Sequence, residues 1–208
     1  MNKIRWFIFA TCVLCLFMIG ILIGCGFKKW QDRTREETSP ETNETFIVQN
    51  NKDEPEWVGK QAALIISKQA QKADILIAYL YKNQIPNHDV SNLLHERWMK
   101  IRKNPKGLRE MSFGEKSAAY TVNKGDELRI CVRDKSSPHK FEDLNTGFFV
   151  LLHELAHLMS RSYGHGIEFK RNFAIITKLA VELDLYKNID YSQNPTSYCN
   201  TEIAHSPY

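Results

Sequence analysis

The sequence GFFVLLHELAHLMSRSYGHGIEFKRNF, from Gly147 to Phe173, combines an apolar run with three histidines. His153 and His157 are four residues apart, so an α-helix places both imidazoles on one face. Together with Glu154 they form HExxH, the pattern of a helix that binds zinc through its two histidines. Zinc lowers the pKa of a bound water to about 7, and the glutamate accepts its proton during attack on a carbonyl. The stretch therefore predicts a zinc site with Glu154 as the catalytic acid and base.

The apolar neighbours of HELAH favour metal binding over a chance match. They are the residues expected on a helix that is buried in a core: Phe148, Phe149, Val150, Leu151, Leu152 and Leu155. Two histidines and a glutamate are costly to bury there unless something binds them.

A third zinc ligand is expected after this helix, because a catalytic zinc commonly has three protein ligands and an open position. His165 follows His157 by eight residues, and Glu168 follows it by eleven. Glycines on both sides of His165 permit a sharp reversal of the chain, and neutral imidazole suits zinc. Tyr163 stands where metzincins carry their third histidine, which excludes that class. We predict His165 as the ligand, with Glu168 as the alternative; otherwise Glu168 orients a ligand.

The first 56 residues are predicted to lie outside the folded domain. Residues 6–27 carry no charge and are long enough to cross a hydrocarbon core of about 30 Å, so residues 1–29 are expected to form a transmembrane anchor. Lys and Arg are more numerous after this segment, which favours a cytoplasmic side for the rest. A lipoprotein is the alternative, because residues 22–25, ending in Cys25, resemble a lipobox. Residues 30–56 are polar and acidic, as in a flexible linker.

Residues 57–208 are predicted to form one α+β domain of helices and a small β-hairpin. The chain is 43% hydrophobic and 25% charged, which suits a globular protein, and its net charge of +4 neither requires nor excludes an anionic partner. Apolar residues at helical spacing predict helices over 58–81 and 167–186. Alternating apolar residues on either side of 123–126 predict the hairpin.

Further helix boundaries and a turn-rich tail follow from capping and breaker residues. Asp89 can cap a helix that ends near residues 99–101, and Asp143 or Asn145 can cap the helix that carries HELAH to about Ser162. The segment from residue 187 onward is rich in turn residues.

Several other residues allow more than one interpretation. Cys131 and Cys199 either form one disulfide or stay reduced, since two distant cysteines do not make a disulfide framework. His205 or Tyr198 could stabilise an oxyanion if the tail folds back over the site. A basic cluster favours a solvated loop over a nucleic-acid or lipid contact, because Trp98 is the only aromatic residue near it. The cluster consists of Lys100, Arg102, Lys103, Lys106 and Arg109.

HELAH followed by GHG-x-EF resembles the SprT-like and WLM zinc metallopeptidases, and the WLM domain is the closer match. The short gap to the third histidine and the preceding hairpin, YTVNKG and then ICVRD, support that likeness, which covers residues 111–208. The resemblance implies a compact zincin-like fold with His153, His157 and His165 as Zn²⁺ ligands and Glu154 as the catalytic acid and base. It also implies a hairpin strand at which an extended peptide binds by β-augmentation.

The membrane anchor departs from the familiar members of these families, which are soluble nuclear proteins that act on proteins crosslinked to DNA. A protein or peptide substrate is therefore expected, whereas a nucleic-acid partner is not. The plan also resembles small membrane-tethered chains encoded by large DNA viruses.

These patterns together predict a membrane-anchored zinc-dependent metalloendopeptidase, with its domain slightly favoured on the cytoplasmic side. The competing hypothesis is a non-catalytic membrane-bound protein that acts in protein interaction and keeps zinc for stability. Glu154 argues against it, because a purely structural zinc site has no use for an acid beside its ligands.

Overall fold

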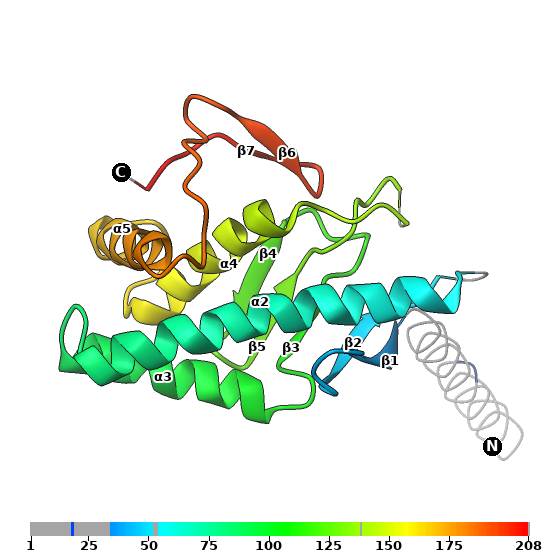
Figure 1. Cartoon of the computed structure of the whole chain (residues 1–208), viewed down its shortest axis with the longest axis horizontal. Helices are drawn as coiled ribbons and strands as arrows, with labels where there is room; N and C mark the ends of the chain where they lie inside the picture. Colours follow the sequence, from blue (N-terminus) through cyan, green and yellow to red (C-terminus); the bar gives the residue numbers. More distant parts are fainter. Residues whose placement is uncertain (1–17, 19–33, 52–53, 138, 208) are drawn as a thin grey trace, which may run out of the picture.

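The long helix α2 crosses the whole domain and contacts two of the other helices and the sheet (Figure 1). A computed structural model describes residues 18, 34–51, 54–137 and 139–207. The helices of these residues are α2 (Glu56–Asn83), α3 (His88–Lys103), α4 (Leu144–Met159) and α5 (Ile167–Glu182). The α+β class predicted from the sequence is confirmed.

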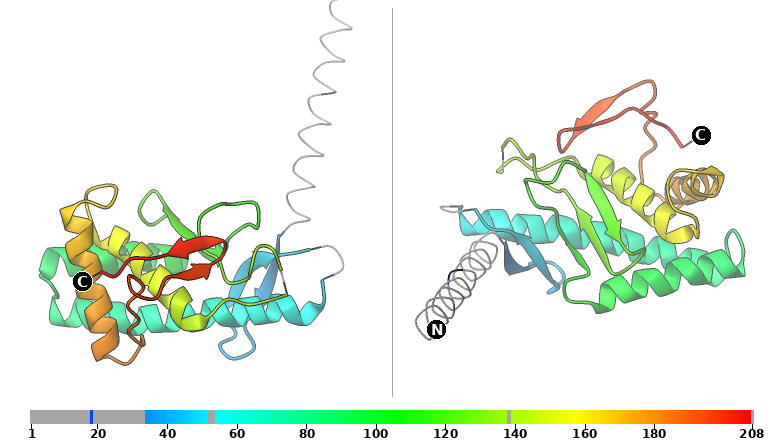
Figure 2. Two further views of the ribbon diagram at one scale, coloured as in Figure 1. Left: turned by 90° about the horizontal axis from the view of Figure 1, so that it is seen from above. Right: turned by 180° about the vertical axis from the view of Figure 1, so that it is seen from behind.

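A mixed five-stranded sheet packs against α2 and α4. Its strands, in spatial order, are β1 (Thr34–Thr38), β2 (Thr45–Gln49), β3 (Leu108–Glu110), β5 (Glu127–Ile130) and β4 (Ala119–Val122). The outer pairs β1–β2 and β4–β5 are antiparallel, and β3 lies parallel to both of its neighbours. Figure 2 shows from behind that the strands cover one side of α2. This order places β4 at the outer position of the sheet, beside α4.

The helices with strong apolar periodicity form where the sequence predicts them. On α2 the buried side chains recur at helical spacing, and the helix ends where Gln84 adopts a left-handed conformation with φ of 53°. The hairpin is also confirmed, because β4 and β5 flank a turn in which Asn123 and Lys124 have φ of 45° and 52°. Two residues with positive φ match the right-handed twist of the strands that they join.

The caps differ in detail from the sequence-based expectation. The cap of α3 is Asn87, whose side chain accepts the backbone N–H of Val90 at 3.1 Å, and not Asp89. Asp143 caps α4 by accepting from Thr146, as one of the two expected alternatives. The helix ends at Met159, before the predicted Ser162.

The prediction of a flexible linker over residues 30–56 is wrong for its central part. Residues 34–49 form β1 and β2, and Phe46 and Val48 of β2 are buried with exposed fractions of 3% and 0%. The residues of β1 are all exposed or half-buried, and the three-residue apolar run Phe46–Val48 in β2 is too short to stand out in a polar and acidic segment.

Removing residues 1–56 is therefore expected to destabilise the domain. The truncated chain loses the burial of Phe46 and Val48, each worth about 1.5–3 kcal/mol, out of the roughly 5–15 kcal/mol typical of a domain. It also loses Glu54 and the Gln49 carbonyl oxygen, which accept hydrogen bonds from the fully buried Arg133 at 2.8 and 2.9 Å. Thermal unfolding checks this, with a chain that begins at Arg33 as the control. Equal melting temperatures for the two chains would show that β1 and β2 are dispensable.

The C-terminal tail, expected to be turn-rich, contains a second hairpin. Strands β6 (Thr196–Tyr198) and β7 (Thr201–Ile203) pair antiparallel across a turn in which Cys199 and Asn200 both have positive φ. Cys199 forms a disulfide with Cys131, which directly follows β5. Of the two states left open by the sequence, the structure therefore contains the bridged one.

The predicted transmembrane anchor, residues 1–29, lies outside the described residues apart from Met18. Among the helices that the structure does describe, none combines the length and the apolar character needed to cross a bilayer.

The basic cluster between residues 100 and 109 is a solvated loop only in part, since Lys106 lies in an exposed turn and Lys103, at the end of α3, is exposed as well. Its other members, Lys100, Arg102 and Arg109, lie in the last turns of α3 and in the short strand β3, which the sequence did not predict, and they pair with acids. Arg109 contacts Glu127 at 2.6 Å, and Arg102 contacts both Glu44 and Asp74. This pairing leaves less free positive charge for an anionic partner than the sequence alone indicates.

Candidate metal centre

Helix α4 carries His153, Glu154 and His157 on the side that faces β4 and α5. The helix is anchored by its apolar residues: Phe148, Leu151, Leu152, Leu155 and Leu158 all have an exposed fraction of 0%. Such complete burial fixes the rotation of the helix about its axis, so the polar residues of HELAH have a defined direction.

The three histidines predicted as ligands come together at one point. The Nε2 atom of His165 lies 3.0 Å from Nε2 of His153 and 3.2 Å from Nε2 of His157. In a tetrahedral site with Zn–N distances of about 2.0–2.1 Å, two ligating nitrogens lie roughly 3.3 Å apart. The donor set and its spacing therefore fit a zinc ion.

Phe169 holds this arrangement from the side of α5. Its ring centroid lies 4.3 Å from that of His157, 4.7 Å from His165 and 4.8 Å from His153, and the residue is 3% exposed. Contacts with all three imidazoles restrict their rotamers, which pre-organises a metal site.

Burial also sets the protonation of two histidines. Burial, with a smaller contribution from neighbouring positive charges, lowers the pKa of His153 to about 3 and that of His157 to about 4. Both rings are therefore neutral near pH 7, which is the form that binds metal ions.

Glu154 is 6% exposed and lies between α4 and β4. Burial raises the pKa of its carboxyl to about 7, and hydrogen bonding from Thr121 of β4 opposes part of this rise. The residue is not in the group of side chains whose ligand atoms converge. It thus stands beside the candidate metal position without occupying it, as the acid and base of HExxH must.

Glu168, the alternative ligand, points into the loop that precedes it. Its carboxylate accepts the backbone N–H groups of Arg161 and Ser162 at 2.8 and 2.9 Å, and the Ser162 hydroxyl at 2.5 Å. These bonds lower its pKa to about 2. Glu168 therefore braces the loop that carries His165, the positioning role that the sequence allowed for it.

Two cations hold the same loop from its other side, and sequence reasoning missed both. The Nζ atom of Lys124 donates to the carbonyl oxygens of Ser160, Arg161 and Ser162 at 2.8, 2.8 and 2.5 Å. Arg97 of α3 donates to the carbonyl oxygens of Leu158 and Ser160. Lys124 was visible in the sequence only as part of a hairpin turn, and nothing local marks it as a partner of residues 160–162.

Replacing Glu168 by Gln is expected to weaken zinc binding about 10–100-fold, the usual effect of losing an orienting residue. The amide offers one neutral acceptor oxygen in place of the two charged oxygens of the carboxylate. The loop therefore loosens, and His165 is held less well. The pKa of the Glu168 carboxyl is about 2 in the folded protein, below its ordinary value of 4.5. The contribution of Glu168 to the stability of the folded protein is therefore complete above pH 4.5 and is lost as the pH falls to about 2. Zinc titration against a competing chelator measures the change. The exposed Glu182→Gln, on the same helix, is the control, and equal affinities in the two variants would contradict the role.

The two residues considered for oxyanion stabilisation have different fates. Tyr198 is 4% exposed and donates its hydroxyl to the carbonyl oxygen of Cys131 at 2.6 Å, so that donor is already used. His205 lines two cavities together with His153, so the tail does fold back near the candidate site.

Comparisons with known proteins give relatives in viruses. The chain is 31% identical over 193 residues to "Uncharacterized protein R325" of Acanthamoeba polyphaga mimivirus, covering 92% of this chain and 93% of that protein. It is 26% identical over 145 residues to "Uncharacterized protein 136R" of Invertebrate iridescent virus 6, covering 69% and 76%. No protein-family model matches the sequence.

Among solved structures, part of the chain aligns with the crystal structure of Wss1 from Saccharomyces cerevisiae. The TM-score is 0.33 at 21% identity, over 46% of this chain and 80% of Wss1. The alignment with the mimivirus protein, by contrast, spans nearly the whole of both chains. The chain therefore belongs to the same protein family as R325 of Acanthamoeba polyphaga mimivirus.

Proposed function

We propose that this protein is a zinc-dependent peptidase, with His153, His157 and His165 as the metal ligands and Glu154 as the acid and base. One observation carries the proposal: three imidazole nitrogens converge next to a buried carboxyl group that does not join them. A purely structural zinc site commonly has four protein ligands, whereas three ligands with an adjacent acid suit hydrolysis.

The outer strand β4 supports a peptide as the substrate. A cleft of about 360 Å³ lies between β4 with its turn and the candidate centre, and residues 119–121, 123–124, 153–154, 157 and 163–165 line it. In the described sheet β4 pairs only with β5, so its other backbone edge faces this cleft. An extended peptide that adds to that edge runs past His153 and Glu154.

Each residue then has a distinct task in peptide hydrolysis. Bound zinc would supply a Lewis acid that activates water and polarises the scissile carbonyl. Glu154 takes a proton on its carboxylate and returns it to the leaving amine. Thr121, which hydrogen-bonds to Glu154, holds that carboxylate in place from the strand that binds substrate.

Metal content and cleavage of the full-length protein test the proposal together. We expect one zinc ion per chain and cleavage of fluorescent casein that EDTA abolishes and added Zn²⁺ restores. One tightly bound zinc without cleavage of casein or of a peptide library would support the non-catalytic interpretation instead. Absence of any zinc binding would reject both.

We also propose, from residues 1–29 alone, that this activity is held at a membrane. Extraction at alkaline pH should leave the wild-type protein with the membrane pellet, and deleting residues 1–29 should release it. Release by Cys25→Ser would instead identify a lipid anchor. Two features point to opposite sides of the membrane for the domain. The disulfide between Cys131 and Cys199 favours an oxidising, non-cytoplasmic compartment, because disulfides persist mainly there. The positive-inside rule favours the cytoplasmic side.

A further inference from the structure

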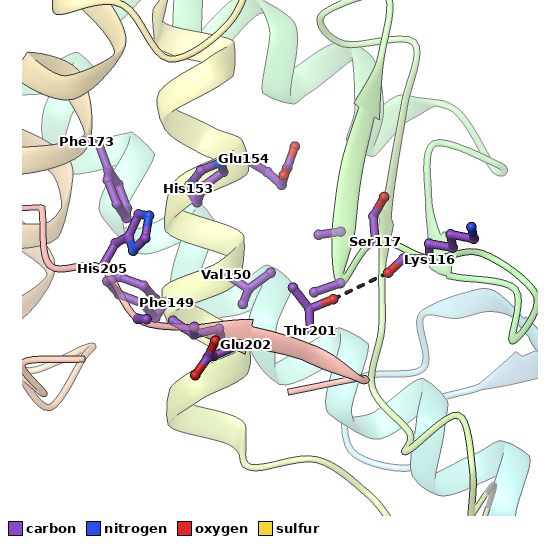
Figure 3. Close-up of a pocket in the computed structure, with 14 residues that line it drawn as sticks. Lys116, Ser117, Phe149, Val150, His153, Glu154, Phe173, Thr201, Glu202 and His205 are labelled. Atoms are coloured by element: carbon purple, nitrogen blue, oxygen red, sulfur yellow. Dashed lines mark hydrogen bonds between the residues drawn. The ribbon is translucent and has the colours of Figure 1, made fainter. Parts of the chain in front are cut away.

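A second cavity opens beside Glu154, on the side away from the GHG loop, and the hairpin β6–β7 forms part of its wall (Figure 3). Its volume is about 490 Å³, within the range of roughly 300–1,000 Å³ for sites that bind small groups. It shares His153 and Glu154 with the cleft along β4, so the two spaces meet at the candidate metal centre.

Apart from His153 and Glu154, the interior of this cavity is mainly apolar, and its exposed polar residues lie at the rim. The apolar lining comes from three parts of the chain: Phe149 and Val150 of α4, Phe173 of α5, and Ile203 with Ala204 in and after β7. Lys116, Ser117 and Glu202 also line it, but these residues are exposed. An occupant that enters past the rim therefore meets mainly hydrocarbon and aromatic surface.

The hairpin wall is fixed in place by bonds to three other segments. Cys199 is joined to Cys131 by the disulfide, and its backbone N–H donates to a carboxylate oxygen of Glu142 at 2.8 Å. The hydroxyl of Thr201 donates to the carbonyl oxygen of Lys116 at 3.3 Å, the contact dashed in Figure 3. The wall is thus a built part of the site and not a loose tail.

Gly147, the first residue of the HELAH stretch, makes room for this wall. A Cβ atom at position 147 would lie 2.7 Å from the hydroxyl oxygen of Tyr198, below any normal contact distance. Tyr198 is buried and bonded to the carbonyl oxygen of Cys131, so it has no free space to move away. The catalytic helix and the hairpin therefore fit together closely.

We infer that this cavity is the specificity pocket of the proposed peptidase and that it takes a bulky apolar side chain next to the scissile bond. The inference rests on the proposed function, because a peptide lying along β4 with its carbonyl at the metal centre directs a neighbouring side chain into the adjoining cavity. The apolar interior favours a Phe, Leu or Met side chain over a small or charged one.

Cleavage-site profiling of a peptide library with the zinc-loaded full-length protein tests this preference. The wild type should cut beside bulky apolar residues. Ala204→Phe fills the pocket, and it should lower kcat/KM for a Phe-containing peptide at least about tenfold relative to its Ala counterpart. Ala78→Phe, an identical change at an exposed position of α2, is the control and should leave the preference unchanged.

A second variant covers the case in which the larger side chain disturbs folding. Ile203→Ala removes wall contacts from a half-buried residue and should reduce the preference for Phe over Ala peptides without loss of zinc. A wild type that cuts without regard to the neighbouring side chain, or variants with unchanged preference, would overturn the pocket assignment while the peptidase proposal stands.

Binding without catalysis separates the two proposals. N-acetyl-phenylalanine amide should shift the methyl NMR signals of Val150 and Ile203 in the wild type, N-acetyl-alanine amide should not, and Ala204→Phe should abolish the response. If these shifts occur but zinc-loaded protein cuts nothing, the pocket is supported and the proposed peptidase activity fails. If the two amides act alike or neither shifts the methyls, the pocket inference is wrong whatever the activity.

Discussion

Replacing Glu154 by Gln is expected to lower kcat for peptide hydrolysis about 10²–10⁴-fold, the usual contribution of a positioned general acid and base. The amide keeps the shape of the side chain but cannot accept a proton at neutral pH. Zinc content should stay at the wild-type level, because Glu154 is not among the residues whose ligand atoms converge. The combination of lost activity and retained zinc is specific to a catalytic role.

The choice of Gln over Ala matters because Glu154 is 6% exposed and packs between α4 and β4. Alanine would leave a cavity next to the metal centre and confuse a packing effect with a chemical one. Glu96→Gln, the same change at an exposed position of α3, is the control. Casein cleavage that persists at the wild-type rate in Glu154→Gln would rule out the proposed mechanism.

Replacing His165 by Ala is expected to weaken zinc binding by more than about 100-fold, beyond the 10–100-fold typical of a residue that only orients a ligand. The variant removes one of the three nitrogens that converge, and the remaining two histidines on α4 form an incomplete site. Glu168→Ala should fall in the smaller range, because its carboxylate is bonded to residues 161 and 162.

Competition with a chromophoric chelator ranks the two variants on one scale. The variant with the weaker zinc affinity identifies the third ligand. If Glu168→Ala abolishes binding while His165→Ala keeps it near the wild-type value, the third ligand is the glutamate and the loop rearranges when metal binds. Ser206→Ala, in the tail beside His205, is a control for general effects of mutation near the cleft.

The parts of the fold that the sequence predicted share strong local patterning. Helix α2 has a long run of apolar residues at helical spacing, and the β4–β5 hairpin has alternation on both sides of a turn. Strand β2 lacked such a signal because its apolar run, Phe46–Val48, is only three residues long and polar or acidic residues lie on both sides of it. Strand β3 has three residues, too few for a period to be visible.

The candidate site likewise has a part that local sequence patterns predicted and a part that they did not. Spacing alone was enough to propose that His153, His157 and His165 share one point, since the first two lie on one helix and glycines flank the third. The interactions that hold the loop of His165 depend on the tertiary fold, because Lys124 lies 36 residues before the Ser160 carbonyl oxygen that it binds. The hairpin wall likewise depends on Cys131 and Cys199, which are 68 residues apart, so no local pattern could predict it.

The disulfide has a consequence for how a cut within this domain would be detected. Cys131 and Cys199 close a covalent ring that contains α4, α5 and every residue of the candidate metal centre. A single cut in the exposed GHG loop before His165 leaves both fragments tied together, each with part of the ligand set. Electrophoresis without a reductant would show such a chain as intact, and only reduction would reveal the nick. A cut at this loop is therefore hidden in non-reducing electrophoresis and is counted only under reducing conditions.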